Sequence, residues 1–264
     1  MLEYQAYDAT RKNIDTLASI IENISNINSI GYKKTQTSFV ETLNGEIAKH
    51  DTKDFSQGAL RRTGDTLDFA LDGPGFFEVE LPSGQRTYTR VGRFRLSGEG
   101  ELVTEEGYRV IPEVEPSGQS VLEANKKTDN ELGLNLKVST PKLLISHQLT
   151  PEVLGDGTVN GIDPSTGEKT KIGKINLVVF NNPQGLEPVG KGYYLQSASS
   201  GPVMDTDSEQ TKVKQGFLEY GNVDMLSELM DVTHLKGLLS AQFKVLKAID
   251  KIYEQVNITI SRAV

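Results

Sequence analysis

The stretch "GDTLDFALDGPGFFEVELPSGQRTYTRVGRFRLSGEGELVTEEGYRV", residues 64–110, decides the fold of the chain's middle. Apolar and polar residues alternate in "LDFAL" at 67–71 and in "FEVEL" at 77–81, which is the period of a half-buried β-strand. The segments "PSG" at 82–84 and "SGEG" at 97–100 supply turns between such strands. Because the turn signals lie about a dozen residues apart, this region predicts an antiparallel meander rather than βαβ units.

Glycine and proline divide the chain into three parts. Residues 1–30 contain neither, and all ten prolines lie between Pro74 and Pro202. Of the 25 glycines, only Gly237 lies beyond Gly221. Both residues are unfavourable in helix interiors, so the two ends are free to form long helices while the middle forms strands and turns. The chain therefore predicts a mixed α and β fold with a mainly antiparallel central β domain.

Each end carries an apolar stripe at alternating spacings of three and four. At 1.5 Å per residue, the roughly 40 residues from 223 onward span about 60 Å as a helix. A helix of that length needs a helical partner, so we expect the two terminal helices to pair as a coiled coil. We expect two polar residues, Gln242 on the C-terminal stripe and Asn28 on the N-terminal stripe, to fix the register between the two helices. The stripes are Tyr7, Ile14, Leu17, Ile21 and Ile24 at the N-terminal end, and Val232, Leu235, Leu239, Gln242, Leu246, Ile249, Tyr253, Val256 and Ile260 at the C-terminal end.

These patterns predict three regions. Residues 1–34 and 222–264 form a terminal helical domain, 35–63 a polar linker, and 64–221 a β-rich domain. The β-rich domain carries a polar insertion around 116–170 and a further strand at "IGKINLVVF", residues 172–180.

Composition excludes several classes of function. The net charge of −8 and the pI of about 5.1 argue against sequence-independent nucleic-acid binding, which needs a basic surface. The chain has no cysteine, which excludes disulfides and thiol catalysis. No stretch approaches the ~18 apolar residues of a membrane span. The N-terminal residues lack the pattern of a signal peptide, so we expect export, if any, without a cleaved signal.

No motif for catalysis, cofactor binding or metal binding is present. His50, His147 and His234 share no ligand spacing, and neither a nucleophile elbow nor a phosphate-binding loop occurs. The segment "DGTVNGID", 156–163, resembles the start of a calcium loop, but position 12 is Gly167 instead of the bidentate glutamate. A Gly/Asn turn is the simpler interpretation. We therefore expect no catalytic, cofactor or metal site and no small-molecule substrate.

Three ordered motifs resemble the bacterial flagellar axial family, the rod and hook proteins of the basal body. The first is "ENISNINSIGYK", residues 22–33, which is similar to the pattern that ends the N-terminal helix in that family. Its matching residues are Asn23, Asn26, Gly31, Tyr32 and Lys33. Gly31 fits a helix C-cap, where a positive φ costs glycine little.

The other two motifs lie at the entry to the β domain and at its exit. Residues 64–110 resemble the family's Gly-Phe-Phe entry and Tyr-Thr-Arg-x-Gly segment, and "QGFLEYGNV", 215–223, resembles its Gln-Gly-x-Leu-Glu-x-Ser-Asn-Val segment. The three motifs span nearly the whole chain. The matching residues are Gly75, Phe76, Phe77, Tyr88, Thr89, Arg90, Gly92, Gln215, Gly216, Leu218, Glu219, Asn222 and Val223.

The resemblance implies a structural subunit that polymerises into the tubular rod, the drive shaft that transmits torque from motor to hook. It implies a periplasm-spanning location in the basal body and export by the flagellar type III apparatus. The implied partners are further copies of the chain, neighbouring rod proteins and possibly the hook. The implied assembly residues are Ile14, Leu17, Ile21, Asn23, Ile24, Asn26, Gly31, Tyr32, Val232, Leu235, Leu239, Gln242, Leu246, Ile249, Tyr253 and Val256.

The departures from the family pattern after residue 232 favour the proximal over the distal rod. Two alternatives remain open. One is an exported assembly factor or cap-like protein, and the other is a β-rich carbohydrate hydrolase with paired acids.

Overall fold

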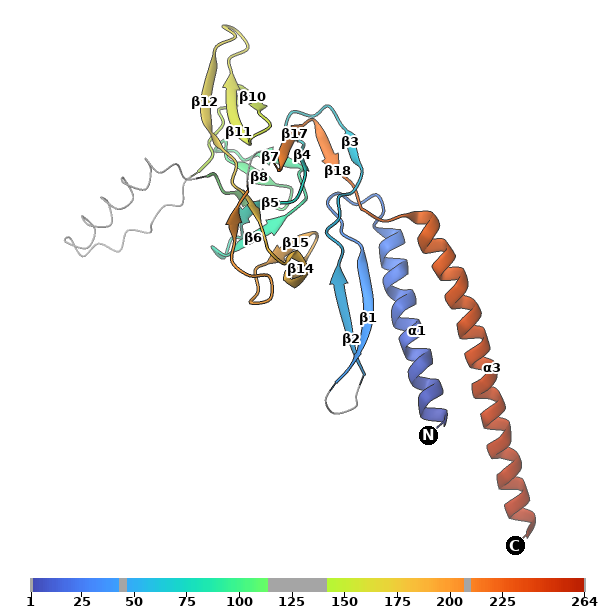
Figure 1. The fold of residues 1–264 in the computed structure, drawn as a ribbon. Helices are drawn as coiled ribbons and strands as arrows, with labels where there is room; N and C mark the ends of the chain where they lie inside the picture. The colour runs from blue at the N-terminus through green and yellow to red at the C-terminus, as the bar shows by residue number, and fades with distance from the viewer. Residues whose placement is uncertain (1, 43–46, 114–141, 207–209, 264) are drawn as a thin grey trace, which may run out of the picture. The chain divides into compact units, whose positions relative to one another are not determined.

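The computed structural model describes residues 2–42, 47–113, 142–206 and 210–263. The chain divides into two compact units (Figure 1). We call Met1–Asn28, Lys33–Asp54 and Asn222–Val264 the helix unit, and Ser29–Tyr32 with Phe55–Gly221 the β unit. The chain therefore passes between the units four times.

The helix unit contains two helices and one hairpin. Helix α1 runs from Leu2 to Ser25, and α3 runs from Met225 to Ala263. Strands β1 (Thr35–Glu41) and β2 (Ile47–Lys53) pair antiparallel. Helix α1 contacts both α3 and β1, so its surface is shared between two partners.

The β unit contains all the other strands of the described residues, and all their pairings are antiparallel. The largest sheet has the order β14-β15-β6-β5-β9-β8-β7, with β13 pairing both β5 and β16. Strands β10, β11 and β12 form a separate three-stranded sheet, and β17 pairs with β4 and β18 with β3. A 3-10 turn, η1, spans Pro183–Gly185. The strands are β3 Leu60–Arg62, β4 Phe69–Asp72, β5 Phe76–Glu80, β6 Arg86–Thr89, β7 Phe94–Leu96, β8 Leu102–Thr104, β9 Arg109–Val110, β10 Thr150–Val153, β11 Thr158–Ile162, β12 Lys169–Lys174, β13 Leu177–Val179, β14 Glu187–Gly190, β15 Tyr193–Leu195, β16 Met204–Asp205, β17 Lys212–Gln215 and β18 Phe217–Glu219.

The core of the β unit lies on both faces of β5. Phe77 and Val79 point into the main cluster, whereas Phe76, one residue earlier, belongs to a second cluster with Tyr88 and Phe180. Side chains of consecutive strand residues alternate between faces, so a Phe-Phe pair supplies one ring to each cluster. The ring centroids of Phe77 and Phe94 lie 5.2 Å apart in an edge-to-face arrangement, which is favourable for aromatic pairs.

The mixed α and β class agrees with the structure, but the prediction of a coiled coil between the terminal helices is wrong. Three members of the expected stripes, Ile14, Ile21 and Tyr253, are 49%, 55% and 54% exposed. The physical reason is that α1 also packs on the hairpin, where Ser19 Oγ lies 2.5 Å from Thr37 Oγ1. A helix that divides its surface in this way leaves Ile14 and Ile21 about half exposed rather than buried in a continuous seam with α3.

Two further expectations need correction. The segment predicted as a linker, 35–63, contains β1, β2 and β3. The predicted strand at 172–180 is two strands, β12 and β13. Of the predicted polar insertion, 150–170 lies within the three-stranded sheet and its flanks, whereas 116–141 lies outside the described residues.

Candidate assembly interface

Asn23 fixes the end of α1 against the hairpin. Its Nδ2 donates to the carbonyl oxygen of Thr35 at 2.9 Å, and its Oδ1 accepts from the Thr35 N–H at 2.8 Å. The side chain is 1% exposed. A buried amide with both ends bonded to one residue's main chain sets the register between α1 and β1. Asn26 instead donates to the carbonyl oxygen of Glu22 at 2.9 Å, within the last turn of α1.

Gly31 has a left-handed φ of +65°, but it is not the C-cap of α1, because the helix already ends at Ser25. The flanking Ile30 forms a bridge with Tyr220, and the Gly31 N–H donates to the carbonyl oxygen of Glu219 at 2.8 Å. A Cβ at Gly31 would lie 2.7 Å from the main-chain nitrogen of Val91. Glycine is therefore required here by a close main-chain approach inside the β unit.

Arg90 and Glu219 form a buried ion pair in the β unit. Arg90 Nη1 lies 3.2 Å from Glu219 Oε2, and the two side chains are 3% and 1% exposed. Glu219 Oε1 also accepts from the Gly58 N–H at 2.8 Å. Burial lowers the pKa of Arg90, and the facing Glu219 carboxylate opposes that shift. The pair therefore joins the β entry motif to the exit motif, which are 129 residues apart.

Asn222 and Glu228 link distant chain segments within the helix unit, as Arg90 and Glu219 do within the β unit. Asn222 Oδ1 accepts from the Lys34 N–H at 2.8 Å, and its Nδ2 donates to the carbonyl oxygen of Asp54 at 2.8 Å. Lys34 Nζ lies 2.5 Å from the carboxylate of Glu228, which is 1% exposed and sits in the first turn of α3. Asp224 Oδ1 accepts from the Leu226 N–H and caps that helix. One amide thus ties together three separate chain segments.

The remaining residues of the entry and exit motifs are structural, and all of them except Val223, which belongs to the helix unit, lie in the β unit. Gly92 allows Phe69 to approach, because a Cβ there would lie 1.6 Å from the Phe69 carbonyl oxygen. Thr89 Oγ1 donates to the carbonyl oxygen of Gly192 and accepts from the Val91 N–H. Gly75 and Gly216 have positive φ, and Gln215 Oε1 accepts from the Val153 N–H. Buried motif side chains are Phe76, Phe77, Tyr88, Leu218 and Val223.

The predicted assembly residues of the helices do not all lie in one contact. Leu235 and Leu246 are buried, and Gln242 Oε1 accepts from Asn13 Nδ2 at 3.0 Å. Ile24, Tyr32, Val232, Leu239 and Ile249 are half-buried, and Leu17 is half-buried beside the exposed Ile21. The side chain of Val256 lies outside the described residues.

A groove of about 600 Å³ runs between α1 and α3. Leu17 and Ile21 line it from α1, and Val232, Leu239 and Phe243 supply most of its apolar lining from α3. The remaining lining residues are Lys236, Ser240, Lys244 and Lys247.

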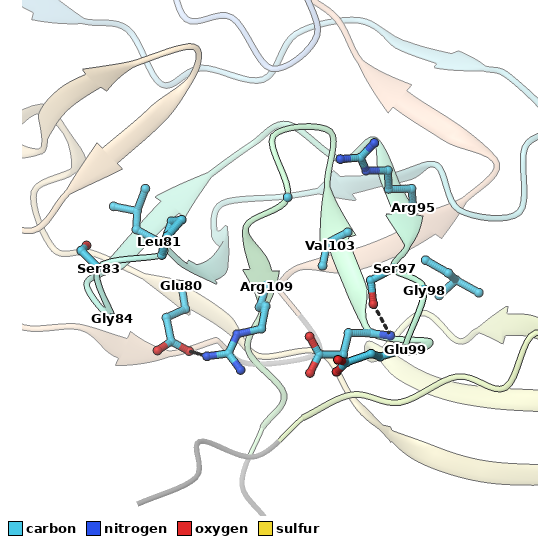
Figure 2. A pocket seen from close by; sticks show the side chains of 14 residues that line it. Glu80, Leu81, Ser83, Gly84, Arg95, Ser97, Gly98, Glu99, Val103 and Arg109 are labelled. Carbon is cyan, nitrogen blue, oxygen red and sulfur yellow. Dashed lines mark hydrogen bonds and ion pairs between the residues drawn. The ribbon is translucent and has the colours of Figure 1, made fainter. Parts of the chain in front are cut away.

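A wider hollow of about 1160 Å³ lies on the β unit, over the turns after β5 and β7 (Figure 2). Arg109 from β9 reaches toward Glu80, and its Nη2 lies 2.9 Å from Glu80 Oε2. Glu101, also in the lining, pairs with Lys142 at 2.5 Å. These two carboxylates are neutralised by cations, so they do not form the free acid pair that glycoside hydrolysis needs.

The described residues contain neither a candidate metal-binding cluster nor a candidate membrane-spanning helix. No cluster of three histidine or acidic side chains could hold a metal ion in that part of the chain. No helix within the described ranges is both long and apolar enough to cross a membrane.

Comparison with known proteins agrees with the motifs. Residues 70–148 match the model of the flagellar hook protein FlgE/F/G D1 domain. The flagellar basal-body rod protein FlgG of Buchnera aphidicola (subsp. Schizaphis graminum) is 26% identical, with 95% of each chain covered. The chain resembles flagellar rod proteins of the FlgG and FlgF type.

Other relatives carry the same two names. FlgG of Bacillus subtilis (strain 168) is 28% identical, covering 93% of this chain and 94% of that protein. The rod protein FlgF of Rhizobium meliloti is also 28% identical, and the similarity covers 84% of this chain and 80% of that protein. These rod-protein matches confirm the resemblance that the three motifs predicted.

Sequence reasoning missed several residues that the structure brings together. They include Lys34 and Glu228, which pair with each other, and Asn13, which bonds Gln242. Nothing in the sequence around these polar residues indicates their distant partners. The exposed stripe on α3, Leu238, Ala241, Val245, Ala248 and Ile252, was also missed. Its spacing alternates between three and four, so the same periodicity that marked the neighbouring stripe could have found it.

Proposed function

We propose that this chain is a structural subunit of the bacterial flagellar basal-body rod. The observation that carries the proposal is similarity to rod proteins over nearly the full chain. The three motifs support it, because their residues form two structural hydrogen-bond networks rather than a catalytic site. One network is centred on Glu219 in the β unit and the other on Asn222 in the helix unit.

In this function the helix unit polymerises, and the β unit carries load between neighbours. Exposed apolar side chains such as Ile21 and Ile252 gain roughly 25 cal/mol per Å² when a neighbouring copy covers them. A tube requires heterologous contacts that do not close into a ring. The proposed partners are further copies of the chain, neighbouring rod proteins and the hook.

The rod spans the periplasm, and the subunit reaches it through the flagellar export apparatus without a cleaved signal peptide. Within the rod we favour the proximal segment, on the departures of the sequence after residue 232. Neither the Arg90–Glu219 ion pair inside the β unit nor the lysines that line the groove of the helix unit bear on the choice between proximal and distal rod.

Catalysis is not part of the proposal. A β-rich carbohydrate hydrolase would need two free carboxylates in a cleft, whereas Glu80 and Glu101 are each ion-paired. An assembly factor or cap-like protein would share the helical ends but would be lost from the finished rod.

Deletion of the gene tests the proposal. We expect non-motile cells whose basal bodies, viewed by electron microscopy, stop at the rod, with rescue by the intact gene. Growth to a complete hook and filament would overturn the rod function. Quantitative mass spectrometry of purified basal bodies separates the alternatives, because a rod subunit stays in them at several copies per particle whereas a cap-like factor is absent. The point where assembly stops distinguishes proximal from distal rod.

A further inference from the structure

Helix α3 carries a second apolar stripe that the fold leaves uncovered. It consists of Leu238, Ala241, Val245, Ala248 and Ile252, and we call it the outer stripe. Its three large members are 41%, 52% and 59% exposed. Spacings of seven residues between Leu238, Val245 and Ile252 place them in one line along the helix. None of the five residues is charged.

The outer stripe and the groove face different directions on the same helix. Val245 lies two residues from the groove residue Phe243, which corresponds to a turn of about 200° around the helix axis. One copy can therefore offer its outer stripe to one neighbour while its groove accepts another. Two different surfaces that face apart give a head-to-tail contact, which builds an open helical assembly when its rotation does not close into a ring.

The stripe and the groove match in length and chemistry. On α3 the groove extends from Val232 to Lys247, about 22 Å, and the outer stripe extends from Leu238 to Ile252, about 21 Å. Alanines between the large side chains let another helix approach closely. The groove lysines, Lys236, Lys244 and Lys247, can cover the contact with their aliphatic stems while their ammonium groups stay in water.

We propose that the outer stripe of α3 in one copy docks into the groove between α1 and α3 of the next copy. This inference rests on the proposed rod function, because it takes the occupant to be a second copy of the chain. It adds the two surfaces that meet and the head-to-tail direction of the contact.

Engineered cysteines test the docking, because the chain has none of its own. Cells carry a chain with both S240C in the groove and V245C in the outer stripe, and their basal bodies are isolated and oxidised. We expect a ladder of disulfide-linked multimers of this chain. Each single variant, and the exposed β-unit control K212C, is expected to give at least tenfold less product.

The outcomes separate this docking from the function beneath it. Absence of the wild-type chain from basal bodies isolated from wild-type cells would overturn the rod function itself. Presence of the double variant in the rod without the ladder would overturn the docking alone, as would a product linked to a different rod protein. The variant V245D adds a check, because it should abolish rod assembly while the thermal unfolding of the full chain stays unchanged.

Discussion

In the β unit, Phe76, Phe77 and Val79 are at most 2% exposed, whereas in the helix unit Ile21, Val245 and Ile252 are more than half exposed. Both regions carry regular apolar patterns. The β unit satisfies its pattern within one chain, and its motif residues support that fold. The helix unit leaves part of its pattern without an intramolecular partner, which is what a polymerising element requires. The same kind of pattern therefore serves folding in the β unit and, in the proposed rod function, assembly in the helix unit.

The strongest test of the β unit as a self-sufficient fold is to break the buried pair. Arg90→Met should lower the free energy of unfolding by about 3–5 kcal/mol, because it leaves the Glu219 carboxylate buried without its cation. Urea unfolding followed by circular dichroism measures the change. The control Lys169→Met removes an exposed pair with Glu152 and should cost less than about 1 kcal/mol. Equal costs for the two variants would contradict the role of burial.

The close approach at Gly31 gives the next largest effect. Gly31→Ala should cost about 3 kcal/mol, because φ is +65° and the new Cβ would meet the main chain at Val91. Gly98 has no neighbouring atom within 4 Å of its ideal Cβ position, so Gly98→Ala should change stability by less than about 0.5 kcal/mol. Thermal unfolding of both variants compares them. If the Gly31 variant were as stable as the Gly98 variant, the close approach to Val91 would not require glycine at position 31.

Two valines compare the units directly. Val79→Ala should destabilise the β unit by about 2–3 kcal/mol, since Val79 is fully buried. Val245→Ala should cause no measurable loss in the unassembled chain, since Val245 is 52% exposed and alanine favours helix. Differential scanning calorimetry gives both values. If Val245→Ala destabilised the free chain comparably, the outer stripe would serve folding rather than assembly.

The pH dependence sharpens the picture of the β core. Burial is the largest cause that raises the pKa of Tyr88, to about 12 from its ordinary value of 10. Because the folded state holds its proton more tightly, stability is full below pH 10 and falls as the pH rises toward 12, by about 2 kcal/mol. Urea midpoints across this range measure the slope. Tyr88→Phe should reduce the slope without abolishing it, because burial also raises the pKa values of Tyr193 and Tyr194. An unchanged slope would assign the whole effect to other groups.

The smallest effect is expected where the two helices meet. Gln242→Leu removes the bond to the Asn13 amide in a partly exposed position and should cost less than about 1 kcal/mol. The β unit should stay folded in this variant, and rod assembly should be impaired. Normal swimming with rods of normal length would show that Gln242 sets no register.

Local patterns predicted the elements that depend on local physics. Alternation at 67–71 and 77–81 marks β4 and β5, because successive side chains of a strand point to opposite faces. The burial of Ala70 and Glu78 shows that both strands are covered on both faces rather than half-buried. The absence of glycine and proline marks α1. The hairpin β1–β2 was missed because its strand "IAKHDTK" is polar and largely exposed, so no apolar alternation announces it.

Partners distant in sequence were beyond such patterns. Arg90 meets Glu219 across 129 residues, and neither local sequence indicates the other. The coiled-coil prediction failed for a related reason. A stripe such as Ile14–Ile21 shows that a surface is apolar, but not whether its partner lies in the same chain, and here Ile14 and Ile21 stay about half exposed.

Asn222 has a mechanical consequence. Its amide bonds the main chain at Lys34 and at Asp54, so three of the four segments that leave the helix unit, those toward residues 32, 55 and 221, start from one cross-linked point. A force applied to any one of these segments is therefore shared with the other two through the hydrogen bonds of Asn222. In the proposed rod function, a load on the β unit would therefore reach the helix unit through linked segments of the main chain rather than through a single one.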